Sequence, residues 1–181
     1  MKTIKLVCAG FGGQGVLTIG QMVAMMAMQK GLAVSWIPSY GPEMRGGTAN
    51  CHVVIDESDV GSPIIADGIT HLLVMNQPAL DKFVSMMDKN GTIIINSSLI
   101  KDPKIPSGLT LIAVDSYQIA QDVGSIKVQN MAALGCLSKA LDLFKLEEGL
   151  AVIEDKFKGK DTTLVQQNQA AFIKAYNIQA S

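Results

Sequence analysis

The stretch LVCAGFGGQG, residues 6–15, joins a continuous apolar run to a loop rich in glycine. An apolar run that ends in glycines is typical of a strand buried on both faces, and residues 14–31 then have the apolar crowding of a helix. Gly10, Gly12 and Gly15 match the pattern G-x-G-x-x-G between this strand and this helix. Such a loop lets backbone N–H groups approach a phosphate, so the stretch predicts a site for a phosphorylated ligand; the alternative is a tight turn that binds nothing.

Apolar strands and helices alternate along the rest of the chain. The sequence predicts further strands at 32–37, 49–56, 70–76, 91–98 and 109–116, and helices at 78–89, 129–144 and 162–177. This alternation predicts an α/β fold, a Rossmann-like doubly wound and mostly parallel sheet with a helical C-terminal part. No repeat or long linker divides the chain, so we expect a single domain over residues 1–181. Its α/β core should cover about 1–116 and its helical part about 117–181.

The composition is poor in charge for a chain of 181 residues. Charged residues make up 17% and hydrophobic residues 48%, whereas charged residues average roughly 25% of a soluble domain. Two explanations stay open: a well-packed α/β core, or an apolar surface that a permanent partner covers. The formal net charge of −1 provides no basic field, so we expect no binding to nucleic acid or to an anionic membrane.

The cysteines and the apolar segments bear on the cellular compartment. Cys8, Cys51 and Cys136 are odd in number and show no C-x-x-C spacing. This predicts reduced thiols in a cytoplasmic protein, with no iron–sulfur cluster or structural zinc on this chain. The run MVAMMAM, residues 22–28, is too short to cross a bilayer, and no secretory signal is evident.

Open parallel sheets bind ligands outside the carboxyl ends of their strands, and in this chain neutral hydrogen-bonding groups follow those ends. The sequence shows no Ser–His–Asp arrangement, no metal-ligand cluster and no pair of carboxylates there. We therefore expect a binding crevice with no catalytic and no metal-ligating residue on this chain. The expected cofactor-binding residues are Gly10, Gly12, Gly13, Gln14, Gly15, Asn76 and Asn96.

The stretch WIPSYGPEMRGG, residues 36–47, stands where a dinucleotide-binding fold would place an acidic residue for the ribose. No Asp or Glu occurs there before Glu43, which disfavours NAD, and Arg45 lies well beyond the strand end for NADP. Prolines and glycines make this loop stiff with sharp bends. We expect it to contact a ligand or a partner subunit, although a Glu43–Arg45 ion pair that only holds the loop is the alternative. The expected contact residues are Tyr40, Glu43, Arg45, Gly46 and Gly47.

Several stretches together resemble one family. GFGGQGVLTIGQ (10–21), PSYGPEMRGGTANCHVVI (38–55), GSPI (61–64) and the helical NMAALG (130–135) are similar to the γ subunit, or γ-type domain, of the 2-oxoacid:ferredoxin (acceptor) oxidoreductases. The resemblance runs from Ile4 to about Leu141, and the sequence of the stretch 38–55 is closest to the bacterial 2-oxoglutarate type.

This resemblance implies a subunit of a larger enzyme, one that oxidatively decarboxylates a 2-oxoacid to acyl-coenzyme A and CO₂ and reduces ferredoxin. It implies α, β and possibly δ partner subunits, with thiamine diphosphate, Mg²⁺ and the iron–sulfur clusters on those partners. The γ chain would then contribute to the coenzyme A site and to assembly, without turnover alone. Two alternatives stay open: a freestanding NADP- or flavin-binding oxidoreductase, and a non-catalytic nucleotide-sensing or scaffold subunit.

Overall fold

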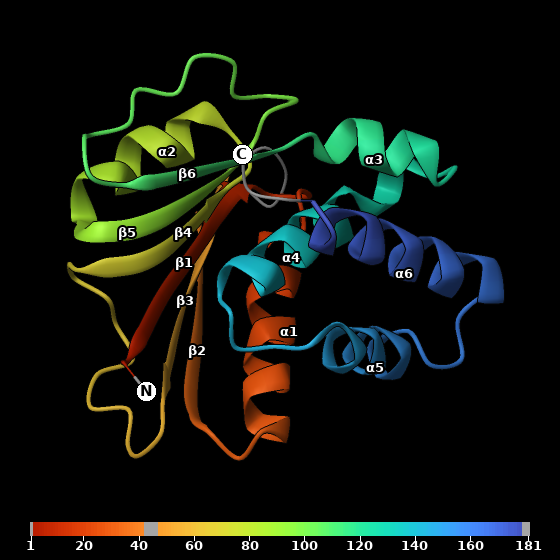
Figure 1. Cartoon of the computed structure of the whole chain (residues 1–181), viewed down its shortest axis with the longest axis horizontal. Helices are drawn as coiled ribbons and strands as arrows, with labels where there is room; N and C mark the ends of the chain where they lie inside the picture. The colour runs from red at the N-terminus through yellow and green to blue at the C-terminus, as the bar shows by residue number, and fades with distance from the viewer. Residues whose placement is uncertain (1, 42–46, 179–181) are drawn as a thin grey trace.

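A six-stranded sheet forms the centre of the computed structural model, which describes residues 2–41 and 47–178 (Figure 1). The spatial order of its strands is β2-β3-β1-β4-β5-β6. All strands run the same way except β3, which is antiparallel to both neighbours, so the predicted mostly parallel sheet is confirmed. The strands are β1 (Ile4–Phe11), β2 (Ala33–Tyr40), β3 (Thr48–Asp56), β4 (Ile69–Val74), β5 (Met87–Asn96) and β6 (Thr110–Val114).

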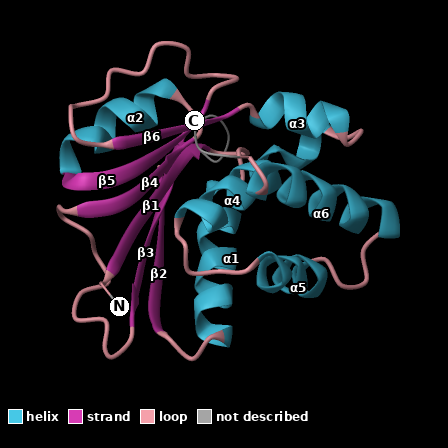
Figure 2. Ribbon diagram, viewed as in Figure 1, coloured by secondary structure: helices cyan, strands magenta, loops and turns pink. Residues whose placement is uncertain are grey.

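Helices cover both faces of the sheet unequally. In the part of the chain that the structure describes, one short α-helix lies on one side of the sheet and five lie on the other, and Figure 2 shows the two groups on opposite sides. Within β1, Leu6 and Cys8 belong to the core beneath the five helices, while Val7 and Ala9 belong to the core beneath the single one. The single helix is α2 (Gln77–Phe83), and the five are α1 (Val16–Gln29), α3 (Ser116–Asp122), α4 (Gln129–Ala140), α5 (Leu146–Lys156) and α6 (Thr162–Tyr176).

The reversed direction of β3 follows from the length of the connection before it. A parallel neighbour needs a crossover of a dozen or more residues, and only residues 41–47 separate β2 from β3. The chain therefore returns as a hairpin, and β3 lies between β1 and β2. This leaves β2 as an edge strand, where Pro38 is tolerated because its missing N–H faces no further strand.

Two expected helices end earlier than their sequence patterns indicate. The helix expected over 78–89 ends at Phe83, continues as a 3₁₀ turn over Val84–Met86, and gives way to β5 at Met87. Its extension to residue 89 is therefore wrong, because the start of β5 pairs with β4 across a register shift. The helix expected over 129–144 ends at Ala140, two residues before Asp142 adopts a φ of 48°.

No helix in the described ranges 2–41 and 47–178 is both long enough and apolar enough to cross a membrane.

Candidate functional site

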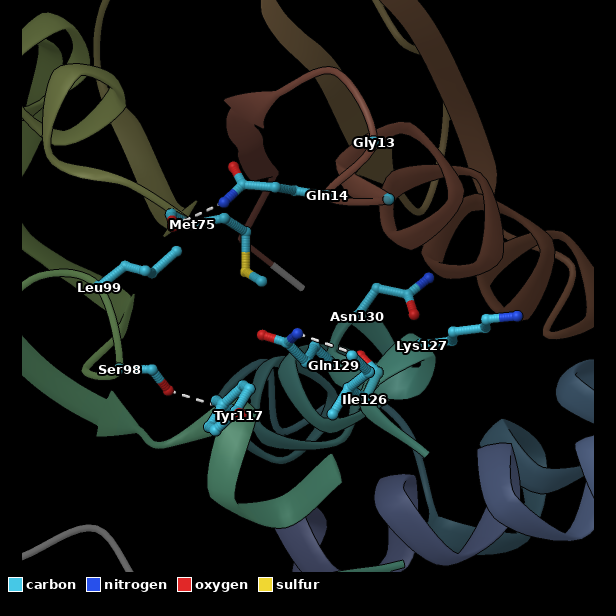
Figure 3. A pocket seen from close by; sticks show the side chains of 11 residues that line it. Gly13, Gln14, Met75, Ser98, Leu99, Tyr117, Ile126, Lys127, Gln129 and Asn130 are labelled. Atoms are coloured by element: carbon cyan, nitrogen blue, oxygen red, sulfur yellow. Dashed lines mark hydrogen bonds between the residues drawn. The ribbon is translucent and has the colours of Figure 1, made fainter. Parts of the chain in front are cut away.

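A cavity of about 410 Å³ lies at the carboxyl ends of the parallel strands (Figure 3). The chain leaves β1 towards β2 on one side and leaves β4 towards β5 and β6 on the other, so the cavity sits at the topological switch point of the sheet. Ligands of open α/β sheets bind at this point. The lining residues are Gly13, Gln14, Gly15, Met75, Ser98, Leu99, Tyr117, Ile126, Lys127, Gln129 and Asn130.

The glycine loop presents the N-terminus of α1 to this cavity. Gly13 (φ 96°) and Gly15 (φ 75°) both adopt left-handed backbone, which suits glycine. Gly15 is the N-cap residue of α1; it provides no side-chain cap, and the first turn contains no acidic residue. The first N–H groups of a helix have no partner within the helix and carry the positive end of its dipole. With Lys127, the one charged side chain among the described residues of the lining, they make this wall of the cavity favourable for an anion.

Gln14 joins the exits of β1 and β4. Its Oε1 accepts hydrogen bonds from the backbone N–H of Phe11 (2.7 Å) and from Nδ2 of Asn76 (3.0 Å). Its Nε2 donates to the carbonyl oxygen of Met75 (3.2 Å), towards which it points in Figure 3. Gly10 makes room for this bridge, because a Cβ there would lie 2.6 Å from Gln14 Oε1. Gln14 therefore shapes the floor of the cavity with its whole amide group.

The loop after β2 meets the glycine loop through one backbone hydrogen bond. The N–H of Gly12 donates to the carbonyl oxygen of Gly47 (2.8 Å), so the two loops that carry the family resemblance are joined. Tyr40, at the end of β2, is 68% exposed. Of the other expected contact residues of this loop, Glu43, Arg45 and Gly46 lie outside the described residues.

Asn76 and Asn96 lie below the cavity and are absent from its lining. Asn76 caps α2, since its Oδ1 accepts from the N–H of Ala79 (2.9 Å) while its Nδ2 donates to Gln14. Asn96 is 1% exposed; its Oδ1 accepts from the N–H of Ser98 (3.2 Å), and its Nδ2 has no hydrogen-bond partner among the described residues. The two side chains thus hold the exits of β4 and β5, and a contact with a ligand remains a prediction.

The exits of β5 and β6 are tied together by a hydroxyl and a carboxylate. Ser98 Oγ donates to Oδ1 of Asp115 (2.6 Å) and accepts from the N–H of Tyr117 (3.0 Å). Asp115 also accepts from the N–H of Gln118 (2.9 Å), which caps α3. The hydrogen bond from Ser98, followed by that from Gln118, lowers the pKa of Asp115. The carboxylate therefore acts here as an ionised acceptor that orders the rim.

Sequence reasoning from strand ends missed the wall of the cavity that comes from helices. Ile126, Lys127, Gln129 and Asn130 lie in or next to the 3₁₀ turn Ile126–Val128 and the start of α4, far along the chain from the glycine loop. The two segments are nevertheless in close contact, because a Cβ on Gly15 would lie 2.7 Å from Asn130 Nδ2. The one available signal was the stretch NMAALG in the resemblance, which begins at Asn130.

The described residues contain no group of three His, Cys, Asp or Glu side chains placed to hold a metal ion. What the cavity offers is a set of neutral hydrogen-bonding groups, the N-terminus of α1 and one lysine. Such a set can bind and orient an anionic ligand.

The chain matches the family model described as pyruvate ferredoxin/flavodoxin oxidoreductase over residues 5–178. It is 38% identical over 162 residues to the ketoisovalerate oxidoreductase subunit VorA of Methanothermobacter marburgensis, covering 88% of this chain and 33% of that protein. It is 28% identical over 182 residues to the 2-oxoglutarate synthase subunit KorC of Methanocaldococcus jannaschii, covering 98% of this chain and 93% of that protein. The chain thus spans about a third of the length of VorA and nearly all of KorC.

Solved structures have the same fold. The γ subunit of a keto/oxoacid ferredoxin oxidoreductase from Geobacter sulfurreducens PCA matches with a TM-score of 0.79 and 25% identity, over 96% of both chains. The 2-oxoglutarate:ferredoxin oxidoreductase from Magnetococcus marinus, with 2-oxoglutarate, coenzyme A and succinyl-CoA bound, matches with a TM-score of 0.89 and 23% identity, over 100% of this chain and 32% of that one. The second likeness concerns the fold alone. Because the family model spans nearly the whole chain, this protein belongs to the pyruvate ferredoxin/flavodoxin oxidoreductase family, and its sequence is of the γ type.

Proposed function

We propose that the chain is the γ subunit of a cytoplasmic 2-oxoacid:ferredoxin oxidoreductase and that its cavity holds the diphosphate of coenzyme A. The complete enzyme would oxidatively decarboxylate a 2-oxoacid, 2-oxoglutarate or a similar one, to acyl-coenzyme A and CO₂ while ferredoxin is reduced. Thiamine diphosphate, Mg²⁺ and the iron–sulfur clusters, carried by the α, β and possibly δ subunits, would supply the decarboxylation and the electron transfer.

The observation that carries this proposal is the anion-favouring wall of the cavity. The uncapped N-terminus of α1, the left-handed Gly13 and Gly15, and Lys127 all border one space. A diphosphate needs several N–H donors and a favourable potential, and a helix N-terminus behind a glycine loop offers both. The role of this chain is therefore to bind and orient the co-substrate.

The order of the strands argues against a dinucleotide. In a dinucleotide-binding fold, the strand next to β1 ends at the acidic residue that reads the ribose. In this chain β3 occupies that place and runs the other way, so the exit of β2 is two strands from the glycine loop. That distance is about 10 Å, since neighbouring strands lie about 5 Å apart. A ribose-reading group at the end of β2 would therefore be too far from the diphosphate.

The rim of the cavity indicates that the site is shared with another subunit. Leu99, Tyr117 and Ile126 line the cavity and expose 55%, 43% and 56% of their surface. Coenzyme A is longer than a cavity of this size, so its pantetheine arm and thiol must extend beyond it. An exposed apolar rim is typical of a surface that a partner covers. A catalytic subunit docked on this rim would receive the thiol next to its own reaction centre.

A charge-removing substitution in the assembled enzyme tests this proposal. The complex is reconstituted with Lys127→Met, and 2-oxoacid-dependent reduction of an electron acceptor is measured over a range of coenzyme A concentrations. Because Lys127 is exposed, solvent screens its charge, and its loss should cost about 1 kcal/mol of binding, a roughly fivefold rise in KM for coenzyme A. An interaction equally strong in the bound and transition states leaves kcat unchanged.

Lys104→Met is the matched control, because Lys104 is also exposed and does not line the cavity. It should leave KM unchanged. If Lys127→Met also left KM for coenzyme A unchanged, the proposal that coenzyme A binds in this cavity would be refuted. The 2-oxoacid is identified by assaying the same complex with 2-oxoglutarate, pyruvate, ketoisovalerate and indolepyruvate, and turnover of none of them would contradict the proposed reaction class.

A further inference from the structure

Two cysteines stand directly opposite each other in the sheet. Cys8 of β1 pairs with Cys51 of β3 in an antiparallel ladder, and both side chains belong to the core beneath the five helices. Directly opposite residues in such a ladder have Cα atoms about 4.5 or 5.5 Å apart. A disulfide requires a Cα separation of about 4.4–6.8 Å, so either kind of pair is within reach of a bond. Both thiols are free and 0% exposed.

The sulfur of Cys51 lies close against α1. Cys51 Sγ donates to the carbonyl oxygen of Val16, the first residue of α1, over 3.5 Å. Gly20 of the same helix allows this approach, because a Cβ there would lie 2.3 Å from Cys51 Sγ and 3.2 Å from Trp36 Nε1. The indole N–H of Trp36 is buried and has no hydrogen-bond partner among the described residues. A thiolate at Cys51 is the anion that it could stabilise.

The two thiols differ in acidity. Burial raises the pKa of Cys8 well above its usual value. The pKa of Cys51 is lowered, mainly by a hydrogen bond from Cys8, while burial acts in the opposite direction. The hydrogen bond between the two thiols therefore favours a thiolate at Cys51 over one at Cys8.

We propose that Cys8 and Cys51 form a peroxide-reactive dithiol that closes to a cross-strand disulfide beneath the first turn of α1. In the first step the Cys51 thiolate attacks hydrogen peroxide, forms a sulfenic acid and releases hydroxide. In the second, the Cys8 sulfur attacks the Cys51 sulfur, the S–S bond forms, and the hydroxyl leaves as water with the Cys8 proton. Two electrons pass from the thiols to the peroxide, and the hydroxide takes up the proton that Cys51 lost, giving two waters overall.

Formation of the disulfide should also affect the cavity at the N-terminus of α1. A disulfide leaves Cys51 without its S–H, so the hydrogen bond to Val16 is lost. Val16 follows Gly15 directly, and Gly15 lines the cavity. The oxidised chain should therefore exchange the amide hydrogens of the second turn of α1, which bond to the carbonyl oxygens of the first turn, faster than the reduced chain.

The experiment oxidises the folded full-length chain with hydrogen peroxide, then unfolds it in the presence of an alkylating reagent and maps the peptides by mass. The expected result is the loss of two of the three alkylatable thiols, a linked peptide pair that contains Cys8 and Cys51, and restoration of both thiols by a dithiol reductant. The same treatment of the urea-unfolded chain should yield mixed pairings that include Cys136.

Cys136→Ala is the matched control. Cys136 is also buried, yet it lies in α4 with no cysteine opposite it, so its removal should leave the disulfide unaffected. Cys8→Ala and Cys51→Ala should each abolish the linked pair. The wild-type map decides the question even where a variant fails to fold. The proposal would be overturned if all three thiols of the folded chain stayed alkylatable after peroxide treatment. It would also be overturned if disulfides that include Cys136 formed as often as the Cys8–Cys51 disulfide.

Discussion

Replacing Gln14 by methionine should loosen the floor of the cavity, because the Gln14 amide makes three hydrogen bonds there. It accepts from the N–H of Phe11 and from Nδ2 of Asn76, and it donates to the carbonyl oxygen of Met75. Methionine has a similar length and shape but no strong donor or acceptor, so Gln14→Met removes these bonds while it keeps most of the packing.

The expected cost follows from these partners. A neutral hydrogen bond contributes about 1 kcal/mol net, and a buried polar group that loses its partner costs about 1–3 kcal/mol. Asn76 is 5% exposed, so its Nδ2 has little access to water once Gln14 is gone. The three losses are coupled and do not add fully, and we expect Gln14→Met to lower the free energy of unfolding by about 2–4 kcal/mol. This is a large share of a typical stability of about 5–15 kcal/mol.

Urea unfolding of the isolated chain, followed by circular dichroism, measures this cost. Gln77→Met is the matched control: Gln77 donates to Asp81 Oδ1 (2.7 Å) one turn along the exposed side of α2, a pair worth about 0.2–0.5 kcal/mol. In the assembled enzyme, Gln14→Met should also raise KM for coenzyme A, since Gly13 and Gly15 flank the substituted residue. A cost for Gln14→Met no larger than that for Gln77→Met would refute the idea that the bridge holds the two strand exits together.

Three further predictions concern single positions. Gly13→Ala should cost about 1–2 kcal/mol in urea unfolding, because a Cβ at φ 96° is strained even though it would meet no atom within 4 Å. Gly135→Ala should cost about 1–3 kcal/mol, since its Cβ would lie 2.3 Å from the backbone oxygen of Phe172 and force α4 away from α6; equal stability to wild type would show that the helices separate freely. Burial lowers the pKa of His52 and of His71, so the unfolded chain binds more protons and stability should fall as pH drops below the unfolded value of about 6.5. Unfolding free energies between pH 8 and 5 measure this, and a variant with both histidines replaced by glutamine should show a flatter profile.

The sequence predicts the strands well because each is a short apolar run bounded by glycine, proline or polar residues. It predicts helix ends less well. Residues 84–89 continue the apolar pattern of α2, yet they leave the helix because β5 must begin beside Ile69 of β4. Pairing between strands is a long-range event and leaves no trace in local periodicity. The direction of β3 was more accessible, since residues 41–47 are too few for a parallel crossover.

Part of the cavity lining can likewise be predicted from the sequence. The rule that ligands lie beyond the carboxyl ends of parallel strands leads directly to Gly13, Gln14 and Gly15. It does not lead to Lys127, in the 3₁₀ turn before α4, or to Asn130 at the start of α4, because both reach the cavity through the packing of the helices on that face of the sheet.

The same rule predicts a ligand contact for Asn76 and Asn96, and that contact stays a prediction. A polar group at a strand exit can bind a ligand, or it can hold the exit in place by bonding to the backbone. Asn76 uses both atoms of its amide within the chain, and Asn96 uses its oxygen in this way. Both are buried, and they hydrogen-bond to Gln14 and to Ser98, which line the cavity.

The inserted strand β3 explains how a nucleotide-like fold operates here without a ribose-reading acid. By separating β2 from β1, it moves the exit of β2 away from the glycine loop, where we propose that the diphosphate binds, and Gly47 lies beside Gly12 instead. The segment 41–47 is thereby joined at one end to the glycine loop and, at the other, to exposed Tyr40. Under the proposed function these residues have no sugar to read, and their contact with a ligand or a partner subunit stays a prediction. The same insertion places Cys51 opposite Cys8, so the geometry that removes the dinucleotide site also creates the dithiol.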